Sequence, residues 1–105
     1  MASRFTVFGA SDCTCSDVAA SLGEALQINL SERESSFKGG KYYFTRGPDG
    51  VEISVERNVR DEEGVYSEPE FSKYKILVYV NYGRVDVDEA VAAISGLHLL
   101  RTENI

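Results

Sequence analysis

The sequence is poor in several residue types, and each shortage argues against a class of function. Its 105 residues include no tryptophan, one histidine, two prolines and two cysteines. It contains no run of about 18 apolar residues, so we expect no transmembrane helix. Basic residues are the scarcer charge, at 11 against 17 acidic ones, and the net charge is −6. Nucleic-acid binders usually carry a basic patch, so we expect neither a nucleic-acid partner nor a membrane partner.

Catalytic and cofactor-binding motifs are also missing. The chain has no phosphate-binding P-loop, no dinucleotide-binding GxGxxG, no GxSxG nucleophile motif and no HExxH zinc motif. His98 is the only histidine, and its sequence neighbours supply neither the nucleophile nor the orienting acid that a catalytic histidine needs. We therefore expect no catalytic residue, no cofactor and no metal, and we predict that the chain is not an enzyme.

Cys13 and Cys15 allow two interpretations. Both precede a predicted helix, whose dipole can lower a thiol pKa and so produce a reactive nucleophile. Alternatively, they are two small residues of a connecting loop, which we favour because neither a CxxC motif nor a nearby histidine accompanies them. Reduced thiols, together with an N-terminal stretch that lacks an apolar signal core, predict a cytoplasmic protein.

Apolar periodicity predicts a single α+β domain over residues 1–105, with the element order β-α-β-β-β-α-β. In chain order we expect a strand at 4–9, then a helix that is capped by Ser16 or Asp17 and runs to about Leu30, and then a loop at 31–40. Three strands should follow, at 41–46, 51–59 and 74–82. The chain should end with a helix that is capped by Asp86 and stopped by Gly96, and with a strand at 97–102. This order predicts a two-layer sandwich: a mostly antiparallel sheet of about five strands with both helices on one face. One candidate topology is a ferredoxin-like arrangement with one strand added.

The run Gly47-Pro48-Asp49-Gly50 predicts a hairpin turn between two strands. Pairing Arg46 with Val51 would place Phe44 opposite Ile53 and Tyr42 opposite Val55 as an apolar face. The other face would then carry Tyr43, Thr45, Glu52, Ser54 and Glu56 toward water.

Negative charge is concentrated in one window. Residues 48–70 hold eight acidic and two basic residues, so the whole net charge of −6 lies there. A localised field of this kind attracts cationic partners and speeds encounter, although a merely solvated acidic loop is the alternative. The candidate partner-binding residues are Glu52, Glu56, Asp61, Glu62, Glu63, Tyr66, Glu68, Glu70 and Phe71, together with Tyr43 and Tyr79 on the open sheet face.

The stretches GGKYYFTRGPDGVEISVERN, EPEFSKYKILVYVNY and GLHLLRTE resemble small uncharacterised bacterial proteins. Over residues 39–103 the chain is also similar to immunity proteins of bacterial toxin systems, which are short, acidic, cytoplasmic α+β proteins without catalytic motifs. The leading hypothesis is therefore a small acidic binding protein whose partner has a basic surface, with an immunity-like inhibitor of a toxin or enzyme as its specific form.

Two alternatives remain open from the sequence. The first is a small ferredoxin-like ligand-binding domain or enzyme that uses the open sheet face as its site. The second is a structural homodimer that joins open sheet faces, with Leu77 and Tyr79 as the buried patch.

Overall fold

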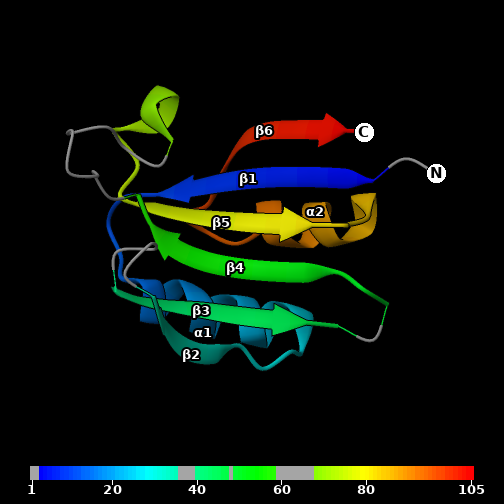
Figure 1. The fold of residues 1–105 in the computed structure, drawn as a ribbon, viewed down its shortest axis with the longest axis horizontal. Coiled ribbons are helices and arrows are strands. Elements are labelled where there is room, and N and C mark those ends of the chain that lie inside the picture. Colours follow the sequence, from blue (N-terminus) through cyan, green and yellow to red (C-terminus); the bar gives the residue numbers. More distant parts are fainter. Residues whose placement is uncertain (1–2, 36–39, 48, 59–67) are drawn as a thin grey trace.

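The computed structural model describes residues 3–35, 40–47, 49–58 and 68–105. Within these residues, six strands form one antiparallel sheet in the order β2-β3-β4-β5-β1-β6 (Figure 1). The elements in chain order are β1 (Arg4–Ala10), α1 (Cys15–Leu26), β2 (Ser31–Ser35), β3 (Gly40–Arg46), β4 (Glu52–Arg57), a short 3-10 helix (Pro69–Phe71), β5 (Ile76–Asn81), α2 (Val85–Ala92) and β6 (His98–Asn104).

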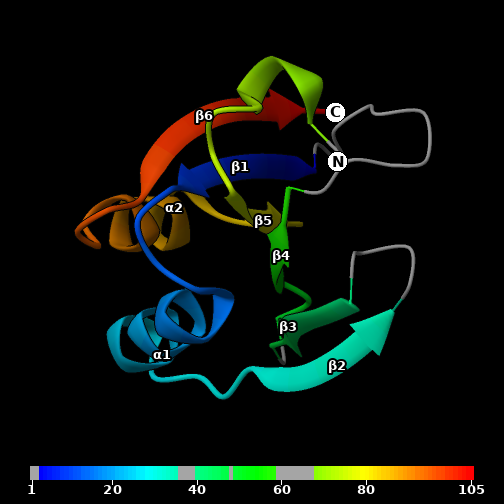
Figure 2. The same cartoon turned by 90° about the vertical axis from the view of Figure 1, so that its left-hand side faces the viewer.

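Both helices lie on one side of the sheet (Figure 2), as expected for a two-layer α+β sandwich. The four strands β4, β5, β1 and β6, with α1 and α2 between them in the chain, follow the ferredoxin-like β-α-β-β-α-β order. Two strands, β2 and β3, are inserted between α1 and β4 and extend the sheet beyond β4. Neither helix in the described parts of the chain is long and apolar enough to cross a membrane.

The sixth strand, β2, corrects the expectation of about five strands and of a loop at 31–40. Its sequence, SERES, has no apolar residue, and four of its five side chains are exposed. It is a sheet-edge strand, held by backbone pairing to β3 from Ser31 opposite Phe44 to Ser35 opposite Gly40. Charged residues at such an edge discourage pairing with another chain.

The β3–β4 hairpin has a register one residue away from the expected one. Arg46 pairs with Glu52 rather than with Val51, and the two side chains form an ion pair at 2.6 Å. The backbone NH of Gly47 donates to the carbonyl oxygen of Val51 at 2.9 Å, so the loop contains one residue more than the four-residue turn. Val51 is buried in the core, which is the physical reason for the longer loop.

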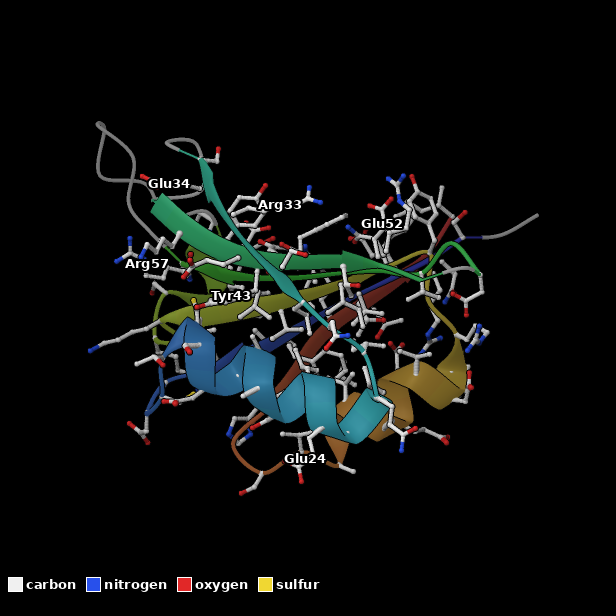
Figure 3. All side chains as sticks on the ribbon, turned by 90° about the horizontal axis from the view of Figure 1, so that it is seen from below. Glu24, Arg33, Glu34, Tyr43, Glu52 and Arg57 are labelled. Carbon is white, nitrogen blue, oxygen red and sulfur yellow. The ribbon has the colours of Figure 1, made fainter. Side chains whose placement is uncertain are left out.

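This shift exchanges the two faces of β3. Phe44 lies opposite Ser54, and Tyr42 and Phe44 share the face that points away from the helices. Tyr43 instead packs against the core on the helix side, where Figure 3 shows it between the sheet and α1. Its hydroxyl donates to Glu32 Oε1 at 3.2 Å. The expected placement of Tyr43 on the open face is therefore wrong.

The core lies between the sheet and the two helices. Its fully buried side chains are β-branched or large apolar residues from the central strands and both helices: Phe8, Leu22, Val55, Val78, Val80 and Val91. The prediction of a central strand apolar on both faces is confirmed, because β5 pairs with β4 on one side and β1 on the other.

The helix boundaries differ from expectation at both helices. Thr14, not Ser16 or Asp17, caps α1: its Oγ1 accepts from the backbone NH of Asp17, and the Asp17 carboxylate accepts from the NH of Thr14. The helix ends at Leu26, before the expected Leu30. Helix α2 begins after Arg84 and ends at Ala92, so the expected cap Asp86 lies in its first turn and the expected stop Gly96 lies beyond its end.

Candidate binding site on the open sheet face

The sheet face opposite α1 and α2 is here called the open face, and the described residues cover one half of it and leave the other half uncovered. Residues 68–75 run across it near β5, β1 and β6, and Tyr74 and Leu100 lie directly over Gly9. A Cβ at Gly9 would lie 2.7 Å from Tyr74 Cγ, so only glycine permits this close approach. Leu77, on the open-face side of β5, is completely buried. It cannot form the intermolecular patch expected of a homodimer.

Asn58 anchors this covering segment. Its side chain is buried, and its amide nitrogen donates to the carbonyl oxygens of Glu68, Phe71 and Tyr74 at 3.4, 3.1 and 3.1 Å. Its side-chain oxygen accepts from the backbone NH of Glu68 at 3.0 Å. One side chain at the end of β4 thus satisfies four backbone groups and fixes where the chain returns to the sheet.

Glu68 joins the covering segment to the sheet. Its carboxylate accepts two hydrogen bonds from the Arg101 guanidinium, at 3.1 and 3.3 Å, and one from the Tyr79 hydroxyl at 3.2 Å. Burial, followed by the negative charges of Glu68 and Glu56, raises the pKa of Tyr79 well above its ordinary value. Tyr79 is therefore a neutral hydrogen-bond donor whose ring is held in a fixed orientation.

The uncovered half of the open face contains a hollow of about 430 Å³. Aromatic, acidic, basic and small polar side chains from β2, β3, β4 and β5 line it: Arg33, Tyr42, Phe44, Glu52, Ser54, Glu56, Tyr79 and Asn81. Figure 3 shows Arg33 and Glu52 on the side of the sheet away from α1.

The pairing registers explain the shape of the hollow. Ser54 on β4 lies opposite Phe44 on β3 and opposite Tyr79 on β5, so a small residue separates two aromatic ones. Residues two apart on a strand share a face, so Glu52 and Glu56 lie on either side of Ser54 along β4. The result has a polar floor, an aromatic wall on each side and a carboxylate toward each end.

Hydrogen bonds and charge fix the two ends of the hollow differently. Glu52 is paired with Arg46, which neutralises that end. Glu56 accepts from the Ser54 hydroxyl at 2.6 Å, which draws its carboxylate over the floor. The guanidinium of Arg33, from the edge strand β2, lies 4.6 Å from the centre of the Phe44 ring, within cation–π distance.

The structure brings together some of the residues proposed from the sequence and separates others. Glu52, Glu56 and Tyr79 line the hollow, and Glu68 supports Tyr79 from beside it. Glu70 and Phe71 lie on the covering segment, where both contact Arg101. Tyr43 lies on the helix side of the sheet. Asp61, Glu62, Glu63 and Tyr66 lie outside the described residues.

Sequence reasoning missed Arg33, Tyr42, Phe44 and Asn81. Three of these depend on strands that were misassigned or paired in the wrong register. The charges of Arg46 and Glu52 contained the needed signal, because opposite charges favour direct cross-strand pairing.

The two cysteines show no sign of an activated thiol. Burial is the main cause that raises the pKa of both Cys13 and Cys15, and Asp17 and Asp12 add to the effect at Cys13. A raised pKa leaves less thiolate at neutral pH, so the geometry does not favour a nucleophilic role. Among the described residues, no group of three or more His, Cys, Asp or Glu side chains is arranged to hold a metal ion.

A second hollow, of about 380 Å³, lies on the other side of the sheet, between α1, α2 and the β3–β4 hairpin. Its walls are mainly apolar, and Arg84 at its rim forms ion pairs with Asp49 and Asp86. These ion pairs connect the hairpin loop to the start of α2. We therefore interpret this hollow as a packing gap between the helices and the hairpin, and not as a binding site.

No protein-family model matches this sequence, and no curated protein or solved structure matches it either.

Proposed function

We propose that the chain is a small acidic binding protein that uses its open sheet face to cover a basic surface of another protein. The observation that carries this proposal is the hollow, in which two aromatic walls flank the Glu56 carboxylate on the sheet face opposite α1 and α2. A few buried residues supply most of the binding energy at protein interfaces and aromatic ones are common among them, whereas acidic residues select a cationic partner.

Within this class we propose an immunity-like inhibitor of a toxin or enzyme, acting in the cytoplasm. Three features support it: the net charge of −6, the concentration of that charge in residues 48–70, and two cysteines that are not paired in a disulfide. Inhibition would follow from occlusion, because a protein that covers a basic catalytic or substrate-binding surface blocks it without chemistry of its own.

Site-specific photocrosslinking tests the proposal in the organism that encodes the chain. A benzophenone amino acid replaces Tyr42 in the hollow or, as the control, Glu24, which Figure 3 shows on the far side of α1. We expect the Tyr42 position alone to capture a protein that, once purified, forms a stoichiometric complex with this chain. Equal capture from both positions, or adducts containing only a second copy of this chain, would contradict the proposal.

Two alanine variants then separate binding from folding on the same strand. Phe44→Ala removes a wall of the hollow and should weaken the purified complex at least tenfold with a small loss of stability. Tyr43→Ala, one residue away, removes a ring packed on the core and should destabilise the fold while leaving affinity nearly unchanged. The reverse pattern would place the interface on the helix side.

A further inference from the structure

We infer that the free edge of β6 pairs with the same edge of a second copy of this chain, antiparallel and with Thr102 opposite Thr102 of the second copy. The two sheets would then continue into one, with both open faces on the same side. This contact differs from the face-to-face homodimer, which the burial of Leu77 excludes. It does not depend on the proposed function, because the hollow lies on the other strands of the sheet.

The outer side of β6 carries unpaired backbone groups. This strand ends the sheet, and among the described residues no strand pairs with its outer side (Figure 1). On its inner side, Ser3 and Ile105 exchange both of their backbone hydrogen bonds, at 2.7 and 2.8 Å. Pairs that exchange bonds recur at every second residue of an antiparallel ladder. The NH and C=O groups of Thr102 and Asn104 therefore point to the free edge.

The two edge strands differ in how strongly they discourage pairing with another chain. Three of the five residues of β2 are charged, whereas the outward-facing Thr102 and Asn104 of β6 are neither charged nor proline. The large apolar side chains at the two ends of this edge are also exposed, Leu99 at 58% and Ile105 at 75%. A neighbouring strand would remove part of this apolar surface from water.

Charge selects the register of the pair. Hydrogen-bonded pairs join outward-facing residues, so Thr102 can lie opposite either Thr102 or Asn104 of the second copy. The first register places Arg101 opposite Glu103 on both sides of the twofold axis, in the type of pair that brings side chains closest. The second places Glu103 opposite Glu103, and like charges directly opposite each other destabilise a sheet. The sequence of this edge is therefore complementary to itself in the Thr102 register.

The two charged side chains share a face and retain capacity for this contact. Arg101 lies opposite Val7 and Glu103 opposite Phe5 on β1, which puts both on the open face. The Glu103 side chain is 55% exposed, and its carboxylate lies 3.6 Å from Nε of Arg101, which is longer than a hydrogen bond. Arg101 of the second copy could approach this carboxylate more closely.

Self-association of the intact protein tests the inference without any other partner. Sedimentation equilibrium is measured from micromolar to millimolar concentration in about 0.15 M salt, where charges more than about 8 Å apart are largely screened. We expect a reversible equilibrium between monomer and dimer with a micromolar Kd. A strict monomer at millimolar concentration would overturn the inference.

Two pairs of variants locate the contact. Thr102→Pro removes the outward NH and should weaken self-association at least tenfold, whereas Thr102→Ala keeps that NH and should change it less than twofold. Glu103→Arg puts like charges opposite each other in the proposed register and should also weaken it at least tenfold. Glu24→Arg makes the same change of charge on the far side of α1 and should not weaken it.

Urea denaturation of the monomer shows whether each variant folds, and if Thr102→Pro does not, Glu103→Arg decides. Unchanged self-association of Glu103→Arg would overturn the inference. So would stronger association of Glu103→Arg with the wild type than of the wild type with itself, because that result identifies the register with Glu103 opposite Glu103. Crosslinking at Tyr42 reports on β3, away from this edge, so either proposal can fail while the other holds.

Discussion

At the scale of single residues, Gly50 fixes the hairpin turn. Its φ is +88°, and its backbone NH donates to the carbonyl oxygen of Gly47 at 3.0 Å. Open space surrounds the position where a Cβ would lie, so the constraint at Gly50 is backbone conformation and not packing. The turn chemistry predicted from GPDG is therefore correct at this residue, although the pairing that follows it is shifted.

Gly50→Val should destabilise the protein by about 1–3 kcal/mol, because a β-branched residue is strained at positive φ. The urea denaturation midpoint measures this loss. Gly50→Asn is the matched control and should lose clearly less stability, since asparagine tolerates left-handed conformations. Equal losses for both variants would mean that the side chain clashes, contrary to the open space around Gly50.

Tyr79 makes stability depend on alkaline pH. Its pKa in the folded protein is raised, chiefly by burial, above the value of about 10 that it has in an unfolded chain. The folded state then retains a proton that the unfolded state releases, so the free energy of unfolding falls as pH rises beyond about 10. Below that pH the contribution of Tyr79 is fully present.

We therefore expect the denaturation midpoint to decrease above about pH 10, and Tyr79→Phe to flatten that decrease. Tyrosinate absorbance of the folded protein should show one tyrosine that ionises only at higher pH, and this late step should be missing from Tyr79→Phe. An unchanged slope in the variant would assign the alkaline transition to other groups.

At the scale of elements, the open face is shared between the covering segment, residues 68–75, and the hollow beside it. Asn58 holds residues 68–75 over β5, β1 and β6, whereas no segment of the described part of the chain lies over β2, β3 and β4. The covering segment also supports the hollow, since Glu68 fixes the Tyr79 wall. Loosening the cover should therefore disturb the binding site as well as the fold.

Asn58→Ala should lower the free energy of unfolding by about 2–4 kcal/mol, because it leaves several buried backbone groups without partners. Hydrogen exchange followed by mass spectrometry should show faster exchange in residues 68–75 and much smaller changes in α1. Asn29→Ala, at an exposed position between α1 and β2, is the control and should match the wild type. Uniform acceleration across the whole chain would indicate global destabilisation instead of release of the cover.

The sequence predicts the elements with apolar signals and fails where those signals are missing. Strand β5 and both helices follow from buried residues at regular spacing, whereas SERES in β2 has no apolar side chain from which a strand could be inferred. The run Tyr42-Tyr43-Phe44 is aromatic on both faces, so hydrophobicity alone cannot fix its orientation. For this reason the prediction placed Glu52, Ser54 and Glu56 correctly on the open face, but assigned Tyr43 to that face in place of Tyr42 and Phe44.

At the scale of the whole molecule, charge is distributed unevenly along the chain. The surplus of negative charge lies within residues 48–70, of which Glu52, Glu56 and Glu68 are placed in or beside the hollow. Such a field acts over roughly one Debye length, about 10 Å at 0.1 M salt, so it steers encounter more than it holds a formed complex.

Glu62→Lys combined with Glu63→Lys should slow association with the captured partner about tenfold at low salt and make the rate less dependent on salt. Glu24→Lys combined with Glu89→Lys changes the net charge equally from the helix layer, and should slow association much less. Stopped-flow mixing over a range of salt concentrations measures both. Equal slowing by the two pairs would show that total charge, and not its position, governs encounter.

The side-chain amide of Asn58 closes the connection between β4 and the covering segment. It binds the main chain of Glu68 through both its oxygen and its nitrogen, so these hydrogen bonds join the end of β4 directly to the start of the covering segment. Lengthening a flexible connection whose two ends are held together costs only about 0.6 kcal/mol per doubling of its length. We therefore expect the connection between Asn58 and Glu68 to accept inserted residues at little cost in the free energy of unfolding, which makes it a place to graft a displayed sequence.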